Sequence, residues 1–358
     1  MGIVIVGYLD QRNARDGRPP GMSLKVNWII PVAHRDFNRM AASIWIRCLQ
    51  LIPYFEARGV RCVINEPGPD VDINVFVRLQ DKRAYELARR LKKQGQKIVC
   101  DLVVNYFDEA EVLHLGKPVT ARHREQILKM LSVADAVTCS SDNIAERARQ
   151  FHPVAEYFPD SIDARHFRYR KSVDDFSASR LRVVWSGVAA KARELEPVLP
   201  LLEKRDIELL VISDGTGRLR LPGRWWRRGF PHRFVRWDYE TFPQRILEGD
   251  LCIAYRSVDN PYNRGHSLFK IGVFMAQGVP AIASPVPSYE EVLAPGKAGR
   301  ICYSIREWED ALDEVLEQRT LLQQWSKEAQ KALEPYSTSS IVDRYLAWFG
   351  ELARKEVN

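Results

Sequence analysis

Residues 264–286 read RGHSLFKIGVFMAQGVPAIASPV, and this stretch decides the fold. Its apolar residues follow helical spacing up to Gly278, a residue type that commonly ends helices. The segment PAIAS comes directly afterwards and has the short, uniformly apolar character of a buried strand. A helix that leads at once into a buried strand predicts a β-α unit of a parallel sheet.

The same alternation runs through the rest of the chain. Strand-like apolar runs are KVNWIIP, RCVINE, INVFVRL, KIVCDLVV and AVTCSS in the first half, and LRVVWSG, IELLVISDG and LCIAY in the second. Helical stretches such as KRAYELARRLKKQG separate them. Residues 151–180 have no clean periodicity and are the expected linker. We therefore expect two α/β domains with a ligand-binding cleft between them.

Composition favours a cytoplasmic protein with an anionic partner. The chain is 46% apolar and 28% charged, and its net charge is +7. No apolar run reaches the ~18 residues that a membrane helix needs. The N-terminal MGIVIVGYLD has neither the basic lead nor the cleavage site of a signal peptide. Six scattered cysteines without a C-x-x-C pair predict reduced thiols, with neither zinc nor disulfides.

The start of the opening stretch has the residue types of an anion site. A helix that begins near Ser267 would leave its first backbone N–H groups free for an anion. Arg264 offers a planar fork suited to phosphate, and Lys270 adds a point charge one turn further. Gly265 would let the backbone approach a ligand closely. The alternative interpretation is that Arg264 and Lys270 are ordinary basic residues of an exposed loop.

A second stretch, VVWSGVAAK, repeats this chemistry. A buried strand ends at Ser186 and Gly187, and Lys191 follows at the start of the next helix. A strand, a small-residue turn and a basic residue commonly hold a phosphate at the carboxyl edge of a parallel sheet. The two stretches together indicate a diphosphate ligand.

Residues 234–293 resemble the C-terminal half of GT-B glycosyltransferases close to family four. The counterparts of the family pattern are Trp237, Asp250, the strand LCIAY, the triplet 264–266, and Lys270 after Phe269. The resemblance implies an α/β GT-B fold with two Rossmann-like domains facing across a cleft. It assigns residues 1–160 to an acceptor-binding domain, with the C-terminal helix packing back on it, and residues 161–358 to a domain that binds a nucleotide sugar.

The implied activity is transfer of a sugar from a nucleoside diphosphate sugar to a glycan or lipid-linked acceptor. The resemblance implies retention of anomeric configuration, with neither a metal nor another cofactor. The donor diphosphate would contact Ser186, Gly187, Lys191, Arg264, Gly265, His266, Ser267 and Lys270. The nucleotide base is left open.

The first half resembles the same family in DFNRMAASIWIRCLQLIPYFEARGV. Ser43 and Arg47 stand at the family's S-x-x-x-R positions, and Asn38 precedes them in the loop expected to face the acceptor. Asp101, in KIVCDLVV, stands at the end of a strand that faces the cleft, and His34 directly follows the first strand. Both are candidate catalytic residues, although a structural carboxylate is the simpler interpretation of Asp101.

The chain also departs from the family pattern. Gly265 and Val273 stand where the family often carries a glutamate pair, whose second member contacts the donor ribose. Glu290 and Glu291 are candidate substitutes, and His266 replaces a lysine. Two alternatives therefore stay open: a GT-B-like binding protein without turnover, and a nucleotide-sugar epimerase.

Residues 217–237 combine seven arginines with tryptophans and contain no acidic residue. Such mixtures serve anionic membranes or nucleic acid, and they also occur as exposed charged loops. We rank an anionic membrane above nucleic acid and expect peripheral attachment to the inner face of the membrane. The expected contacts are Arg224, Trp225, Trp226, Arg227 and Arg228.

Overall fold

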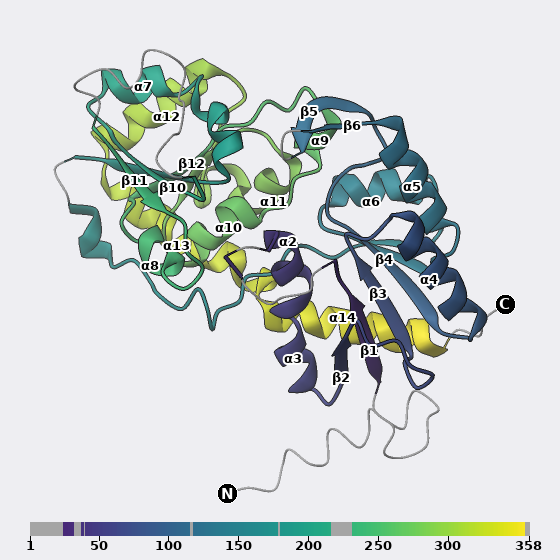
Figure 1. Ribbon diagram of the computed structural model, residues 1–358. Coiled ribbons are helices and arrows are strands. Elements are labelled where there is room, and N and C mark those ends of the chain that lie inside the picture. Colours follow the sequence, from purple (N-terminus) through teal and green to yellow (C-terminus); the bar gives the residue numbers. More distant parts are fainter. Residues whose placement is uncertain are drawn as a thin grey trace, which may run out of the picture.

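The protein is described by a computed structural model that covers residues 24–31, 37–38, 40–114, 117–177, 180–215 and 231–354. Two α/β domains lie side by side, each built on a parallel six-stranded sheet with helices on its faces (Figure 1). This architecture confirms the predicted α/β class and the two Rossmann-like domains. Candidate sites His34 and residues 224–228 lie outside the described residues.

The first sheet has the strand order β2-β1-β3-β4-β7-β8. Its strands are β1 (Lys25–Ile29), β2 (Arg61–Ile64), β3 (Ile73–Val77), β4 (Lys97–Leu102), β7 (Ala136–Cys139) and β8 (Ala155–Tyr157). The covering helices are α4 (Lys82–Lys93), α5 (Ala121–Leu131) and α6 (Asp142–Arg149). Asp81 and Ser141 begin α4 and α6 by accepting N-terminal N–H groups, as N-cap residues do.

The helical segment that follows β1 is broken into three pieces. They are α2 (Ala42–Ile44), the π-helical turn η1 (Trp45–Leu49) and α3 (Ile52–Glu56), which ends before Gly59 at φ +79°. A short hairpin of β5 (Ala110–His114) and β6 (Lys117–Val119) was also not predicted. Val119 and Val104 pack with Tyr262 of the second domain.

The second sheet has the order β11-β10-β9-β12-β13-β14. Its strands are β9 (Arg182–Ser186), β10 (Glu208–Ser213), β11 (His232–Arg236), β12 (Leu251–Ala254), β13 (Ala281–Ala283) and β14 (Gly299–Ile301). The helical segments are η2 (Val173–Ser177), η3 (Ala189–Leu195), α7 (Leu199–Lys204), α8 (Phe242–Ile246), α9 (Pro261–Arg264), α10 (Phe269–Ala276), α11 (Pro287–Lys297), α12 (Ile305–Glu317) and α13 (Thr320–Leu333).

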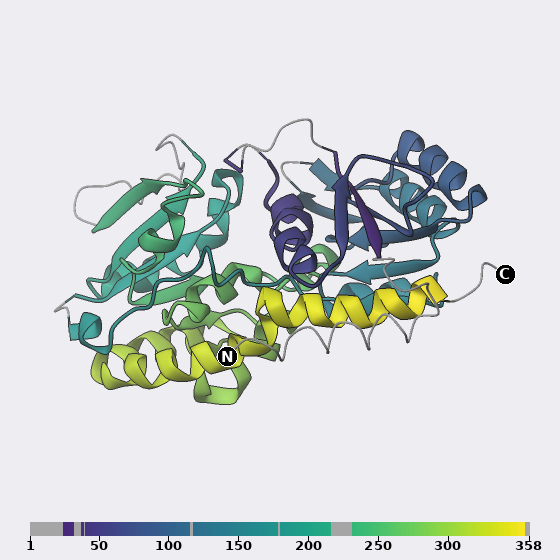
Figure 2. The same ribbon diagram turned by 90° about the horizontal axis from the view of Figure 1, so that it is seen from below.

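The chain returns to the first domain at its end. After η4 (Glu334–Tyr336), the long α14 (Thr338–Arg354) runs beneath the first domain (Figure 2). Tyr345 stacks on Phe158 at a ring distance of 4.0 Å, and Phe349 stacks on Phe55 at 6.0 Å. One hydrophobic cluster therefore includes residues of both domains. Among the described helices, none combines the length and apolar character needed to cross a membrane.

Candidate functional site

Three cations meet at the carboxyl edge of the second sheet. Lys191 lies on η3, Arg256 follows β12, and Lys270 lies in the first turn of α10. Glu194 lies between two of them: its carboxylate is 3.1 Å from Nη1 of Arg256 and 3.2 Å from Nζ of Lys270. We call these four residues the cationic cluster. Three positive charges and one negative charge give it a formal charge of +2.

Local structure explains how this cluster forms. In the 3₁₀ geometry of η3, residues three apart lie in line, so Lys191 and Glu194 share one side. Nζ of Lys270 lies 4.7 Å from the centre of the buried Trp185 ring, a cation–π contact at the end of β9. A Cβ on Gly187 would come within 2.8 Å of that ring, so a glycine is needed there.

The residues of the cationic cluster shift one another's pKa values. Burial, together with Arg256 and Lys270, lowers the pKa of Lys191 to about 7. Burial also lowers the pKa of Lys270, although Glu194 partly compensates. Burial alone would raise the pKa of Glu194, but its cationic neighbours hold it below the ordinary value. Three cations compete for one carboxylate, so a ligand with two or more negative charges would stabilise the cluster.

The structure brings together only part of the predicted donor site. Lys191 and Lys270 belong to the cationic cluster, and Ser186 and Gly187 lie at the end of the adjacent strand β9. Nζ of Lys191 is 3.1 Å from Oη of Tyr262 on α9, and His266 lies edge-on to that tyrosine ring at 5.0 Å.

The remaining loop residues point elsewhere. Arg264 is exposed and lines a separate interdomain pocket of about 280 Å³ together with Asp108 and Arg147. Gly265 packs against the first domain, because a Cβ there would lie 3.2 Å from Ile144. The hydroxyl of Ser267 is donated to Asp160, at 2.5 Å. The donor-diphosphate role of Arg264, Gly265 and Ser267 stays a prediction: in this structure Arg264 lines the separate pocket, and Gly265 and Ser267 contact the first domain and the linker.

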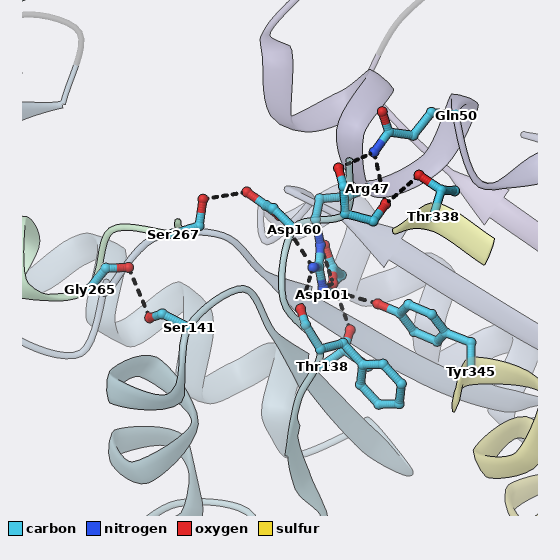
Figure 3. A network of polar contacts seen from close by, with 12 residues as sticks. Arg47, Gln50, Asp101, Thr138, Ser141, Asp160, Gly265, Ser267, Thr338 and Tyr345 are labelled. Atoms are coloured by element: carbon cyan, nitrogen blue, oxygen red, sulfur yellow. Dashed lines mark hydrogen bonds and ion pairs between the residues drawn. The ribbon is translucent and has the colours of Figure 1, made fainter. Parts of the chain in front are cut away.

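Arg47 and Asp101 form a buried ion pair (Figure 3). Nη2 of Arg47 lies 2.6 Å from Oδ1 of Asp101, which also accepts the Thr138 hydroxyl at 2.6 Å. The two residues are only 2% and 3% exposed, so neither side chain can reach a substrate in this structure. The acceptor role of Arg47 and the catalytic role of Asp101 stay predictions, and the buried pairing of the two side chains favours the structural interpretation of Asp101.

Two other acceptor-side candidates, Asn38 and Ser43, are held by hydrogen bonds. Asn38 donates from Nδ2 to Asp238 at 3.1 Å and accepts the N–H of Tyr239 at 2.7 Å, so it bridges the domains. Ser43 accepts a hydrogen bond of 3.1 Å from Arg78, a non-glycine residue at φ +57° just after β3. Backbone in this region is strained for an arginine, a feature that is common at functional sites.

Sequence reasoning missed Arg256 and Glu194. The available signal for Arg256 was its place two residues after a buried strand, at the edge where ligands of parallel sheets bind. Glu290 and Glu291, the candidate ribose ligands, are engaged elsewhere: Glu290 accepts from Tyr303, and Glu291 accepts from Tyr157 and Tyr336. The described part of the chain contains no group of three metal-ligating side chains.

Solved structures share this fold across nearly the whole chain. Sucrose-phosphate synthase from Thermosynechococcus elongatus is 14% identical, with a TM-score of 0.70 over 92% of this chain and 99% of its own. HepE from Anabaena, solved with UDP-glucose, is 12% identical, with a TM-score of 0.64 over 92% and 100%. A Rickettsia africae glycosyltransferase is 9% identical, with a TM-score of 0.64 over 92% and 98%. The chain thus has the GT-B fold.

No protein-family model matches the sequence, and no curated protein matches it either.

Proposed function

We propose that the protein is a glycosyltransferase that uses a nucleoside diphosphate sugar, whose diphosphate binds the cationic cluster. The observation that carries the proposal is the formal charge of +2 at the carboxyl edge of the second sheet. There, among the described residues, Lys191, Arg256 and Lys270 share the carboxylate of Glu194. Ligands of open parallel sheets usually bind at this edge.

The chemistry follows from the charge that develops during glycosyl transfer. As the bond from the sugar to the diphosphate breaks, negative charge accumulates on the leaving phosphate oxygens. Arg256, Lys270 and the protonated form of Lys191, placed there in advance, would stabilise this charge more than that of the ground state, which lowers the barrier. Such a site supports transfer without a metal ion, and the resemblance to family four supports retention of configuration.

Uridine nucleotides are the first donors to test. HepE was solved with UDP-glucose, and the pneumococcal O-GlcNAc transferase GtfA, with a TM-score of 0.59, was solved with UDP and GlcNAc. We propose a glycan or lipid-linked acceptor on the side of the cleft that carries Ser43 and Arg78. The tryptophan–arginine segment 224–228 would hold the protein at an anionic membrane on the cytoplasmic side.

Release of nucleotide in the presence of candidate acceptors tests the proposal. A transferase should release UDP from UDP-glucose or UDP-N-acetylglucosamine faster with an acceptor than without one. An epimerase would change the sugar without releasing UDP, and a binding protein would bind the donor and leave it intact. Either result would overturn the transferase assignment. These two outcomes have to be tested because Gly265 and Val273 stand where the family often carries glutamates.

A further inference from the structure

The loop of residues 265–267, which leads into α10, is tied to three separate parts of the molecule. The carbonyl of Gly265 accepts the hydroxyl of Ser141, at the start of α6 in the first domain, at 3.0 Å. The carbonyl of His266 accepts the hydroxyl of Ser288 on α11 at 2.6 Å. The hydroxyl of Ser267 is donated to Asp160 in the linker at 2.5 Å. The first and third of these bonds are drawn in Figure 3.

Asp160 in turn belongs to a buried polar network. Its carboxylate lies 3.3 Å from Nη1 of Arg47, whose other nitrogens face Asp101. Arg47 also donates to the hydroxyl oxygen of Tyr345 on α14, at 3.0 Å. Asp160 is 6% exposed (Figure 3). Segments far apart in the sequence therefore converge on one guanidinium group.

The charges of this network do not balance by themselves. Two carboxylates, Asp101 and Asp160, face one guanidinium, and the shorter contact of 2.6 Å goes to Asp101. A buried carboxylate that shares its cation needs another strong donor, because leaving it without hydrogen bonds costs several kcal/mol. Ser267 supplies that donor. The hydrogen bond to Asp160 therefore holds Ser267 in position.

Ser267 lies three residues before Lys270, at the entry to α10. We propose that Asp160 and Ser267 are positioning residues, whose hydrogen bond fixes the start of α10 and thereby places Nζ of Lys270 in the cationic cluster. The inference rests on the proposed function of that cluster. Because Asp160 is held by Arg47 of the first domain, the arrangement also links donor binding in one domain to the docking of the other.

The test compares two variants that each lose one buried hydroxyl of the same network. Ser267→Ala removes the bond to Asp160, whereas Thr138→Val removes the 2.6 Å bond to Asp101 and leaves the loop untouched. Calorimetric titration with UDP measures affinity, and thermal unfolding measures stability. We expect Ser267→Ala to weaken UDP binding by roughly 2- to 30-fold, the range for residues that act through others. Thr138→Val should lower the Tm similarly without changing UDP affinity.

Two further variants sharpen the result. Ser267→Thr keeps the hydroxyl and should restore wild-type affinity. Asp160→Asn leaves Arg47 paired with Asp101 alone and should therefore fold. The effects of Asp160→Asn and Ser267→Ala on UDP affinity should not add, because both variants disrupt the same hydrogen bond between Asp160 and Ser267. If wild type binds UDP and Ser267→Ala binds it equally, the positioning role is overturned and the proposed function stands. If wild type binds no nucleoside diphosphate, the proposed function fails and the inference fails with it.

Discussion

The carboxylate of Glu194 lies 3.2 Å from the ammonium nitrogen of Lys270. It also contacts Arg256, at 3.1 Å, so a single carboxylate holds two cations where a donor phosphate is proposed to bind. Such a contact keeps the free protein stable by limiting repulsion between the cations. It also means that a diphosphate must share or replace Glu194 as the anionic partner of Lys270.

Replacement of Glu194 with glutamine should therefore strengthen UDP binding while it lowers the stability of the protein. The change raises the formal charge of the cluster from +2 to +3, which should tighten UDP binding by roughly tenfold, about 1.4 kcal/mol. Loss of a partly buried ion pair should lower the free energy of unfolding by about 2–4 kcal/mol. Titration calorimetry and urea unfolding measure the two effects. Weaker UDP binding in a folded Glu194→Gln protein would show that the carboxylate assists the ligand.

Lys191 should make nucleotide binding depend on pH. Its pKa is lowered to about 7 by burial and by Arg256 and Lys270, and a bound diphosphate would raise it again. UDP affinity should then fall as the pH rises above 7, with uptake of up to one proton on binding. Calorimetry at pH 7.5 in buffers of different ionisation enthalpy would detect this uptake. Lys191→Met should abolish it, and a proton count equal to that of wild type would contradict the assignment.

The same group predicts how stability varies with pH. In the unfolded chain Lys191 titrates near 10.4, so between about pH 7 and that value the unfolded state binds more protons than the folded state. Its contribution therefore makes folding more favourable as the pH rises through this window and less favourable as the pH falls towards 7. Urea unfolding of wild type and Lys191→Met across the window should show a steeper rise with pH in wild type. Parallel curves would count against a neutral, half-buried Lys191.

The buried pair of Arg47 and Asp101 should matter for folding more than for donor binding. Arg47→Met would leave the carboxylates of Asp101 and Asp160 without their cation, which should cost about 3–5 kcal/mol of stability. Asp101→Asn removes one carboxylate and should be milder, with UDP affinity retained. A folded Asp101→Asn protein that binds donor but has lost all turnover would restore the catalytic interpretation of this carboxylate.

Attachment to membranes is predicted from the arginine–tryptophan segment, which lies outside the described residues. Each basic residue near an anionic surface contributes about 1 kcal/mol, so three or four suffice for reversible binding. The protein should sediment with phosphatidylserine vesicles, less so at high salt, and less so when Arg224, Arg227 and Arg228 are replaced by serine. Equal sedimentation with neutral vesicles, or none at all, would argue against a membrane role. Preference for single-stranded nucleic acid would favour the competing interpretation.

The α/β fold could be predicted because the central strands of both sheets are buried on both faces and therefore form continuous apolar runs. β9, β10 and β12 lie where continuous apolar runs predicted them, and Lys191 and Lys270 follow such elements closely. The π-helical turn around Arg47 and the short hairpin carry no comparable pattern.

The network of Arg47 could not be predicted, because its partners Asp101 and Asp160 are 54 and 113 residues away. The loop of residues 264–267 illustrates the same limit. Its glycine, serine and basic residues suit an anion site, yet Gly265 and Ser267 use these properties to join the first domain and the linker. A local motif reveals which contacts are chemically possible. Tertiary packing decides whether a ligand or another part of the chain makes them.

Titration of UDP into wild type and Lys270→Met tests whether the cationic cluster binds the donor diphosphate. Methionine keeps an unbranched apolar side chain and removes the ammonium group, which faces Glu194 and the Trp185 ring. Lys331→Met, which changes an exposed lysine paired with Glu328, is the matched control. We expect wild type and the control to bind UDP equally, and Lys270→Met to bind it more weakly by about 1.5–3 kcal/mol, the range for a charge-assisted hydrogen bond. Equal affinity of all three proteins for UDP, or no binding of any nucleoside diphosphate by wild type, would contradict a donor-phosphate site at the cationic cluster.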